Sequence, residues 1–195
     1  MNKEIMEDRI EEIIKESIRV KEKISRDQIS KIAEAVKLIS DAIKGGGKVI
    51  LFGNGGSAAD AQHISGELVG RFKIERSALP AIALTTNPST LTAISNDYGY
   101  EMTFTRQVEG LGRRGDVVVG ISTSGNSLNV VEAIKRANKM EMKTIALTGN
   151  DGGKVSEIAD LSIIVPSDLT PRIQESHILI GHIICELVEE ELFSV

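Results

Sequence analysis

Hydrophobic residues recur at helical spacing through the first part of the chain. Ile10, Ile13, Ile14 and Ile18 lie among charged residues, and this pattern predicts one long amphipathic helix over about the first two dozen residues. Asp27 is positioned to cap a second helix, which the glycine run at 45–47 would end. The apolar face of that second helix consists of Ile29, Ile32, Ala33, Val36 and Ile43. The pattern therefore predicts a helical segment at about 1–44, ahead of the first strand.

Short apolar runs alternate with helical patterns in the rest of the chain. The runs are KVILF (48–52), PAIALT (80–85), DVVVGIS (116–122), KTIALT (143–148) and LSIIV (161–165). Helices are expected from Ser57, between the second and third runs, from Ser127, at about 154–159 and from about Pro171. Because short, continuously apolar strands separated by helices are typical of parallel sheets, the sequence predicts an α/β fold with helices on both faces of the sheet. No linker interrupts the alternation, so we expect one domain over residues 1–195.

Composition narrows the classes of partner. The chain has 195 residues, of which 41% are hydrophobic and 3% aromatic, and its formal net charge is −5. A chain of this charge has no general attraction for nucleic acid or anionic lipid, and it has few rings for stacking on bases. No stretch is long and apolar enough to cross a bilayer, so we expect a cytoplasmic protein. The single cysteine, Cys185, lies in an apolar helical pattern and is expected to be a buried thiol.

The first strand leads into a glycine turn, VILFGNGGSAAD (49–60). Gly53, Gly55 and Ala58 match the G-x-G-x-x-A pattern of dinucleotide-binding turns. In such folds an acidic residue at the end of the next strand holds the ribose. Here that strand ends in LTTN (84–87), and Glu75 lies before the strand instead of after it. The nucleoside triphosphate pattern G-x-x-x-x-G-K-[ST] is absent as well. We therefore expect no nucleotide cofactor.

A second turn, STSGNS (122–127), follows the third apolar run. Its hydroxyls come from Ser122, Thr123, Ser124 and Ser127, and the backbone N–H groups at the start of the next helix add further donors for a phosphate monoester. Serine, asparagine and glycine also form ordinary turns and helix caps. Four hydroxyls within six residues nevertheless favour phosphate binding. Both turns follow the carboxyl ends of parallel strands, where open α/β sheets bind their ligands.

The three histidines of the chain lie in two segments. His63 and Glu67 are four residues apart on the helix after the first turn, where they could form a metal pair, a catalytic pair or a solvated surface contact. On the last helix, Gln174 and His182 stand about 80° apart and about 12 Å along the axis, so both reach one point only with extended side chains. His177 lies on another face, where a surface or interface position fits as well as chemistry. We favour His182 over His177 for chemistry.

Several motifs together resemble one family. They are GNGGSAADAQH (53–63) with Glu67, SNDYG (95–99), GISTSGNS (120–127), ALTGNDGG (146–153) and RIQESHILIGH (172–182). In this order they are similar to the bacterial phosphoheptose isomerases, the sedoheptulose 7-phosphate isomerases of the sugar-isomerase (SIS) superfamily, over roughly residues 27–192. The resemblance implies a three-layer αβα sandwich, the SIS fold, with a five-stranded parallel sheet preceded by N-terminal helices. It also implies a homotetramer whose active sites use more than one subunit.

The resemblance further implies a reaction and a set of site residues. The reaction converts sedoheptulose 7-phosphate into D-glycero-D-manno-heptose 7-phosphate, the first step toward the nucleotide-activated heptose of bacterial surface polysaccharide. Glu67 would be the base and His182 the acid–base partner. Substrate would contact Asn54, Gly55, Gly56, Ser57, Glu67, Asn96, Asp97, Ser122, Thr123, Ser124, Ser127 and Gln174. The residues that correspond to the zinc site described for the family are His63, Glu67, Gln174 and His182.

Two other functions compete with this interpretation. A non-catalytic relative in the superfamily binds the bacterial replication initiator, and it lacks the positions that match Glu67 and His182, both of which are present here. A sensor or isomerase of another phosphosugar would keep the serine-rich turn and prefer a different carbon chain. Departures from the isomerase pattern are mild: Gly66 stands where some members have a second acidic residue, and Ile64 replaces a common phenylalanine. Neither removes a proposed catalytic group.

Overall fold

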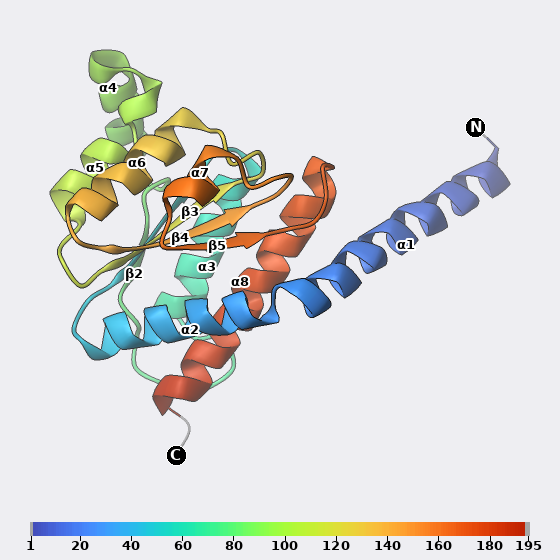
Figure 1. The fold of residues 1–195 in the computed structure, drawn as a ribbon, viewed down its shortest axis with the longest axis horizontal. Helices are drawn as coiled ribbons and strands as arrows, with labels where there is room; N and C mark the ends of the chain where they lie inside the picture. The colour runs from blue at the N-terminus through green and yellow to red at the C-terminus, as the bar shows by residue number, and fades with distance from the viewer. Residues whose placement is uncertain (1, 194–195) are drawn as a thin grey trace.

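The computed structural model describes residues 2–193 and shows a three-layer sandwich with a parallel sheet in the middle (Figure 1). The sheet has five strands in the order β2-β1-β3-β4-β5, and every neighbouring pair is parallel. The strands are β1 (Val49–Gly53), β2 (Ala81–Ala83), β3 (Val117–Ser122), β4 (Lys143–Thr148) and β5 (Leu161–Ile164). The expected fold, a five-stranded parallel sheet preceded by helices, is confirmed.

Helices cover both faces of the sheet. One face carries α1 (Lys3–Asp27), α2 (Ile29–Lys44), α3 (Gly56–Val69) and α8 (Thr170–Phe193). The other carries α4 (Pro88–Tyr98), the 3₁₀ turn η1 (Tyr100–Met102), α5 (Thr105–Leu111), α6 (Leu128–Lys139) and α7 (Gly153–Ile158). None of the helices in the described part of the chain is long and apolar enough to span a membrane.

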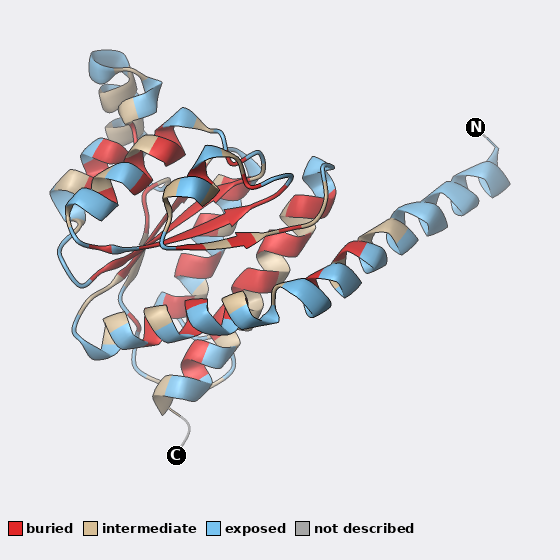
Figure 2. Cartoon of the chain, viewed as in Figure 1, coloured by how far each residue is buried: buried red, intermediate tan, exposed pale blue. Residues whose placement is uncertain are grey.

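Alternation of side chains along the strands divides the hydrophobic core between the two faces. Val49 and Leu51 of β1 pack with α2, α3 and α8, whereas Ile50 and Phe52 pack with α5 and α6. Successive side chains of a strand point to opposite faces, so an uninterrupted apolar run is buried on both sides. Figure 2 shows the strands buried through the middle of the molecule. The short apolar runs therefore predicted the strands correctly.

The junction between the first two helices differs from the sequence expectation. Asp27 is the last residue of α1 and does not cap α2, which is preceded by Gln28 without a side-chain cap. The amide N–H of Gln28 still donates to the carbonyl of Ile24, and the carbonyl of Gln28 already accepts from Ile32. Because the backbone passes from one helix to the next within a single residue, there is no extended residue at Asp27 from which a carboxylate could cap the second helix.

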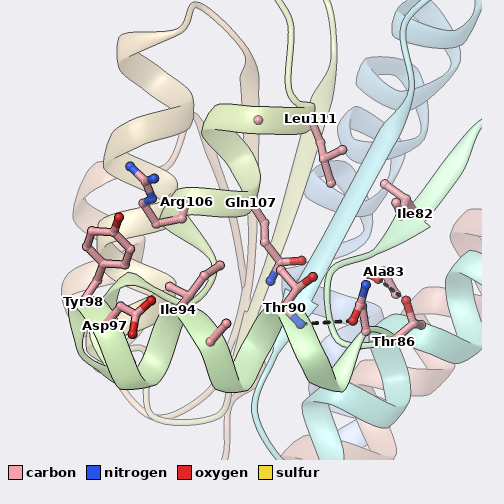
Figure 3. Close-up of a pocket in the computed structure, with 13 residues that line it drawn as sticks. Ile82, Ala83, Thr86, Thr90, Ile94, Asp97, Tyr98, Arg106, Gln107 and Leu111 are labelled. Atoms are coloured by element: carbon pink, nitrogen blue, oxygen red, sulfur yellow. Dashed lines mark hydrogen bonds between the residues drawn. The ribbon is translucent and has the colours of Figure 1, made fainter.

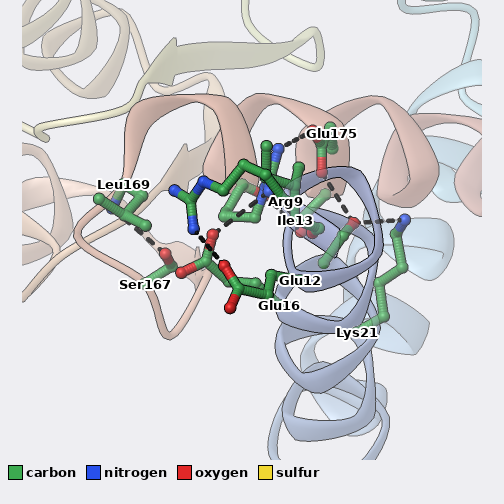
Figure 4. A network of polar contacts seen from close by, with 11 residues as sticks. Arg9, Glu12, Ile13, Glu16, Lys21, Ser167, Leu169 and Glu175 are labelled. Atoms are coloured by element: carbon green, nitrogen blue, oxygen red, sulfur yellow. Dashed lines mark hydrogen bonds and ion pairs between the residues drawn. The ribbon is translucent and has the colours of Figure 1, made fainter. Parts of the chain in front are cut away.

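Helix α1 leaves the body of the molecule as a long arm (Figure 1). Its inner half is buried through Val20 and Ile24. Farther out, a polar network joins α1 to the start of α8 (Figure 4): Arg172 donates to the carbonyl of Ile13 at 3.0 Å and binds the carboxylate of Glu175, which accepts from Ser17 at 2.7 Å. The network fixes the direction of the arm relative to α8, the helix that carries His182.

The strand order brings the two predicted turns together. Strands β1 and β3 are neighbours, with Gly53 opposite Ile121, while the chain runs from β1 outward to β2 and then back across to β3. This reversal is the topological switch point, where the loops after neighbouring strands diverge and leave a crevice. The glycine turn after β1 and the serine turn after β3 border this crevice.

Candidate active site

Three side chains from α3 and α8 form a compact cluster. The Nε2 atoms of His63 and His182 lie 2.9 Å apart, and Nε2 of His63 lies 3.2 Å from Oε1 of Glu67. One ligand atom from each of the three residues lies within 4.8 Å of the others. His63 is exposed, whereas Glu67 and His182 are half-buried. The structure thus brings Glu67 and His182, which are 115 residues apart in the sequence, together within one chain.

Close packing of two helices produces this arrangement. Gly181 of α8 faces Ile64 of α3, and a Cβ at position 181 would lie 2.6 Å from the Cδ1 atom of Ile64. A larger residue would push the helices apart, so this glycine allows His182 to approach α3. Gly56, the first residue of α3, also lies close to α8, because a Cβ at this position would lie 2.4 Å from Nε2 of Gln174. Gln174 therefore reaches from α8 to the first turn of α3.

The donor set of the cluster suits a catalytic metal ion. Two imidazole nitrogens and one carboxylate oxygen form a set of three protein ligands that is common in catalytic zinc sites. Asp60, one turn before His63, has a buried Oδ2 atom without a hydrogen-bond partner among the described residues. Burial raises the pKa of Asp60 above its ordinary value, and the nearby His63 opposes the rise. Asp60 was not among the site residues expected from the sequence.

The glycine turn after β1 is stiffened by a network that the sequence analysis missed. The side-chain amides of Asn54 and Asn129 exchange two hydrogen bonds of 2.9 Å each, and the hydroxyl of Tyr100 donates to Oδ1 of Asn54 at 2.8 Å. Asn129 is buried at the start of α6. Asn54 is thereby held in one orientation at the crevice. Asparagine is common in turns and caps, so the sequence offered no signal that separated Asn129 from a cap residue.

The serine turn after β3 is ordered by its own hydroxyls and by close backbone contact. Ser122 donates to the hydroxyl of Ser127 at 3.0 Å, and Oγ of Ser124 accepts from the amide of Asn126 at 3.2 Å. Gly125 has a φ of +64°, and a Cβ there would lie 1.9 Å from the carbonyl oxygen of Gly152. This turn packs directly on the turn that precedes α7. Ser124 also borders an open cavity of about 780 Å³.

Asn96 and Asp97 lie at the carboxyl end of α4, where the amide of Asn96 donates to Asp97 at 2.9 Å. Asp97 lines a cavity of about 620 Å³ between α4 and α5 (Figure 3). His63, Glu67 and His182 are not among the residues that line it. Across this cavity the guanidinium of Arg106 lies 4.6 Å from the ring centroid of Tyr98. Asn96 and Asp97 remain predicted substrate contacts, although this chain places them in the helix layer opposite to that of Glu67 and His182.

Comparison with known proteins identifies the family of the chain. The SIS domain family matches residues 12–149. A phosphoheptose isomerase from Sulfurimonas denitrificans is 55% identical over 94% of this chain and 95% of its own length, and one from Citrifermentans bemidjiense is 62% identical over 83% of this chain and 84% of its own length. The solved phosphoheptose isomerase from Neisseria gonorrhoeae has a TM-score of 0.91 at 45% identity, covering 95% of this chain and 99% of its own. The chain belongs to the phosphoheptose isomerase family. This confirms the predicted resemblance, the fold and the expectation of an enzyme.

One histidine of this family member lies elsewhere than expected. His177 is fully buried and is not a surface or interface residue of this chain. Its Nε2–H donates to the carbonyl of Thr148 at 3.0 Å, so the ring lies under the carboxyl end of β4. Burial lowers the pKa of His177 to about 4, while the bond to Thr148 opposes the shift. The helix packs against the sheet on this side, which helical spacing alone did not reveal.

The single cysteine behaves as the sequence predicts. Cys185 is buried in α8. Burial, together with the nearby carboxylates of Glu67 and Glu189, raises the pKa of its thiol to about 12. The thiol stays protonated at neutral pH and fills space between α8 and its neighbours.

Proposed function

We propose that this phosphoheptose isomerase converts sedoheptulose 7-phosphate into D-glycero-D-manno-heptose 7-phosphate. The observation that carries the proposal is the placement of Glu67 and His182 in one cluster, in a chain whose turn after β3 carries four hydroxyls. A carboxylate and an imidazole are the groups that a ketose–aldose interconversion requires, and hydroxyls with helix N–H groups suit the phosphate. The product would serve the synthesis of nucleotide-activated heptose.

Each group has a separate part in the proposed reaction. Glu67 takes a proton from one of the two reacting carbons and returns it to the other through an enediol. His182 moves protons between the two oxygens or assists opening of the sugar ring. Ser122, Thr123, Ser124 and Ser127 hold the phosphate or neighbouring hydroxyls. Holding the phosphate end of the sugar reduces the entropic cost of aligning the reacting carbons with Glu67.

The first turn and the end of α4 would contact the rest of the sugar. Asn54, whose amide is already oriented by Asn129 and Tyr100, can present its remaining N–H to a hydroxyl. The other proposed contacts in these segments are Gly55, Gly56, Ser57, Asn96 and Asp97. Because Asp97 faces the cavity between α4 and α5, its contact would require substrate to reach that layer or a second subunit to present it.

We further propose zinc as the bound metal, held by His63, Glu67, Gln174 and His182. Two imidazoles and one carboxylate fit zinc, and Gln174 packs against the first turn of α3, the helix that carries His63 and Glu67. When bound, the ion would polarise the substrate carbonyl. No nucleotide cofactor is proposed, because the glycine turn lacks the acidic partner of dinucleotide sites. A homotetramer is proposed from the family and from the exposed isoleucines of α1.

Replacement of the two proposed acid–base groups tests the reaction. Glu67→Gln should abolish turnover of sedoheptulose 7-phosphate and leave binding of the sugar phosphate, measured by calorimetric titration, largely intact. His182→Gln should likewise lose more rate than affinity, because imidazole chemistry is removed and the phosphate contacts stay. A panel of pentose, hexose and heptose phosphates tests the substrate class. Lost binding with normal residual catalysis would contradict the assigned roles, and absence of isomerisation by the wild type would favour a non-catalytic protein.

Titration of Zn²⁺ into metal-free protein tests the metal site without relying on activity. His63→Gln should lower the affinity for Zn²⁺ by at least about tenfold, since ligand loss at metal sites has effects of this order or larger. His177→Gln is the matched control, because this histidine is buried against β4 and should leave the affinity unchanged. Equal affinities in the wild type and in His63→Gln would refute the proposed ligand set.

A further inference from the structure

A buried ion pair joins the two helices that carry Glu67 and His182. Nε of Arg76, in the segment after α3, lies 2.8 Å from Oε1 of Glu189 on α8, and each side chain is only 1% exposed. Burial by itself would raise the pKa of Glu189, but three backbone N–H donors and Arg76 lower it below its ordinary value. The carboxylate is therefore ionised at neutral pH. None of the sequence motifs that indicated the function includes either residue.

Arg76 binds the end of α3 through backbone carbonyls. Its guanidinium donates to the carbonyl of Glu67 at 3.0 Å and to that of Leu68 at 2.9 Å, and it lies 3.3 Å from the carbonyl of Gly70. The last carbonyls of a helix have no partner within the helix, and a cation there is also favoured by the helix dipole. One of these carbonyls belongs to the proposed base itself. Arg76 thus fixes the backbone from which the Glu67 side chain projects.

Glu189 fixes the other side of the cluster. Its carboxylate accepts from the amide N–H groups of Phe72 at 2.7 Å, Lys73 at 2.8 Å and Ile74 at 3.1 Å. The ring of Phe72, held in this way, lies 5.5 Å from the imidazole of His182, centroid to centroid, at an interplanar angle of 36°. Glu189 also follows His182 by seven residues, which puts both on one face of α8. The carboxylate of Glu189 therefore holds the backbone of Phe72, whose ring packs against His182, and it does so from the face of α8 that also carries His182.

We propose that the Arg76–Glu189 pair is a positioning device of the isomerase site, which sets the spacing of α3 and α8 and holds Phe72 against the imidazole of His182. The inference rests on the proposed function, because only that function gives the distance between Glu67 and His182 a catalytic meaning. Neither member of the pair is a catalytic residue. A displacement of reacting groups by about 1 Å can lower a rate by about a hundredfold, so the pair should act mainly on kcat.

A second buried carboxylate supplies a matched control for the test. Asp116 accepts from the backbone amides of Lys48 at 2.9 Å and Arg113 at 2.8 Å, and it pairs with the ammonium of Lys48 at 2.6 Å. It lies at the amino ends of β1 and β3, the opposite edge of the sheet from the crevice. Asp116→Asn and Glu189→Gln thus remove the same charge from similar surroundings, and only the second touches α8.

Glu189→Gln should lower kcat for sedoheptulose 7-phosphate by about tenfold or more, with KM changed by less than about threefold. Asp116→Asn should lower the melting temperature and leave kcat within about twofold. Arg76→Lys keeps the charge but loses the planar fork that binds several carbonyls, and it should also lower kcat. Equal kcat values in Glu189→Gln and Asp116→Asn would overturn the proposal, since the pair would then be purely structural.

Phe72→Leu tests the link to His182 should the buried variants fail to fold. Phe72 is only half-buried, and leucine leaves its backbone bond to Glu189 in place. We expect kcat to fall by about tenfold, and Phe72→Tyr, which restores a ring, to recover most of it. Unchanged kcat in Phe72→Leu would refute this link.

A measurement of geometry separates this inference from the proposed function. Nuclear Overhauser contacts between the ring protons of Phe72 and His182 should be present in the wild type and weakened in Glu189→Gln or Arg76→Lys. An inactive wild type that shows this change would refute the proposed function and with it the catalytic meaning of the pair, while the link from the pair to His182 would stand. Unchanged contacts in both variants would refute the positioning device, whether or not the wild type isomerises the sugar.

Discussion

His177 and His182 lie on the same helix, yet their surroundings give them different properties. His182 is half-buried and lies in a cluster with His63 and Glu67. His177 is fully buried and donates to the carbonyl of Thr148. Desolvation penalises the charged form of an imidazole, so burial keeps His177 neutral and leaves it a structural role. At the scale of single residues, environment and not residue type separates the acid–base candidate from the core histidine.

The neutral state of His177 predicts a pH dependence of stability. Its pKa is about 4 in the folded chain and about 6.5 in an unfolded one. The unfolded state therefore binds the proton first, and the stabilisation, fully present above about pH 6.5, is lost as the pH falls toward 4, by about 3 kcal/mol. Urea unfolding of the wild type should show this loss between those values. His177→Gln retains an N–H donor without titrating and should flatten the dependence; parallel curves for both proteins would contradict the assignment.

Among the elements, α1 differs most between its two halves. Val20 and Ile24 near its end are buried in the core, whereas Ile10 and Ile14 are 51% and 54% exposed. The helical pattern was predicted from the sequence, but the same isoleucine periodicity runs through both halves. Only the packing shows that the outer stripe is uncovered in a single chain. The elements that sequence analysis resolved least were α5, η1 and the α1–α2 junction, because short helices and tight junctions carry few periodic positions.

The exposed stripe predicts that α1 contributes to assembly. Replacing both Ile10 and Ile14 with glutamine should convert the proposed tetramer into smaller species in light scattering, because the apolar area that would be buried between copies is lost. Ile29→Gln is the control, since Ile29 is 61% exposed on α2, and it should leave the mass unchanged. An assembly of the same mass in the double variant would exclude this stripe as an interface.

For the whole molecule, the strand order is the feature that makes a site from separate motifs. The reversal between β1 and β3 places the glycine turn next to the serine turn. Packing of α8 against α3 then adds His182 from 119 residues away. The Arg76–Glu189 pair joins the same two helices at a separation of 113 residues. The last two contacts depend on each other, because a change in the spacing of α3 and α8 moves both.

The sequence by itself determined the strands and the main helices, the turn chemistry at two strand ends and the family resemblance. These features are encoded over a few neighbouring residues, as hydrophobic periodicity or as turn and hydroxyl composition. Only the tertiary structure decided that His177 is buried, that Asn129 and Tyr100 orient Asn54, and that Arg76 and Glu189 join α3 to α8. Such contacts depend on how helices pack across the sheet, and that packing arises from many distant side chains at once.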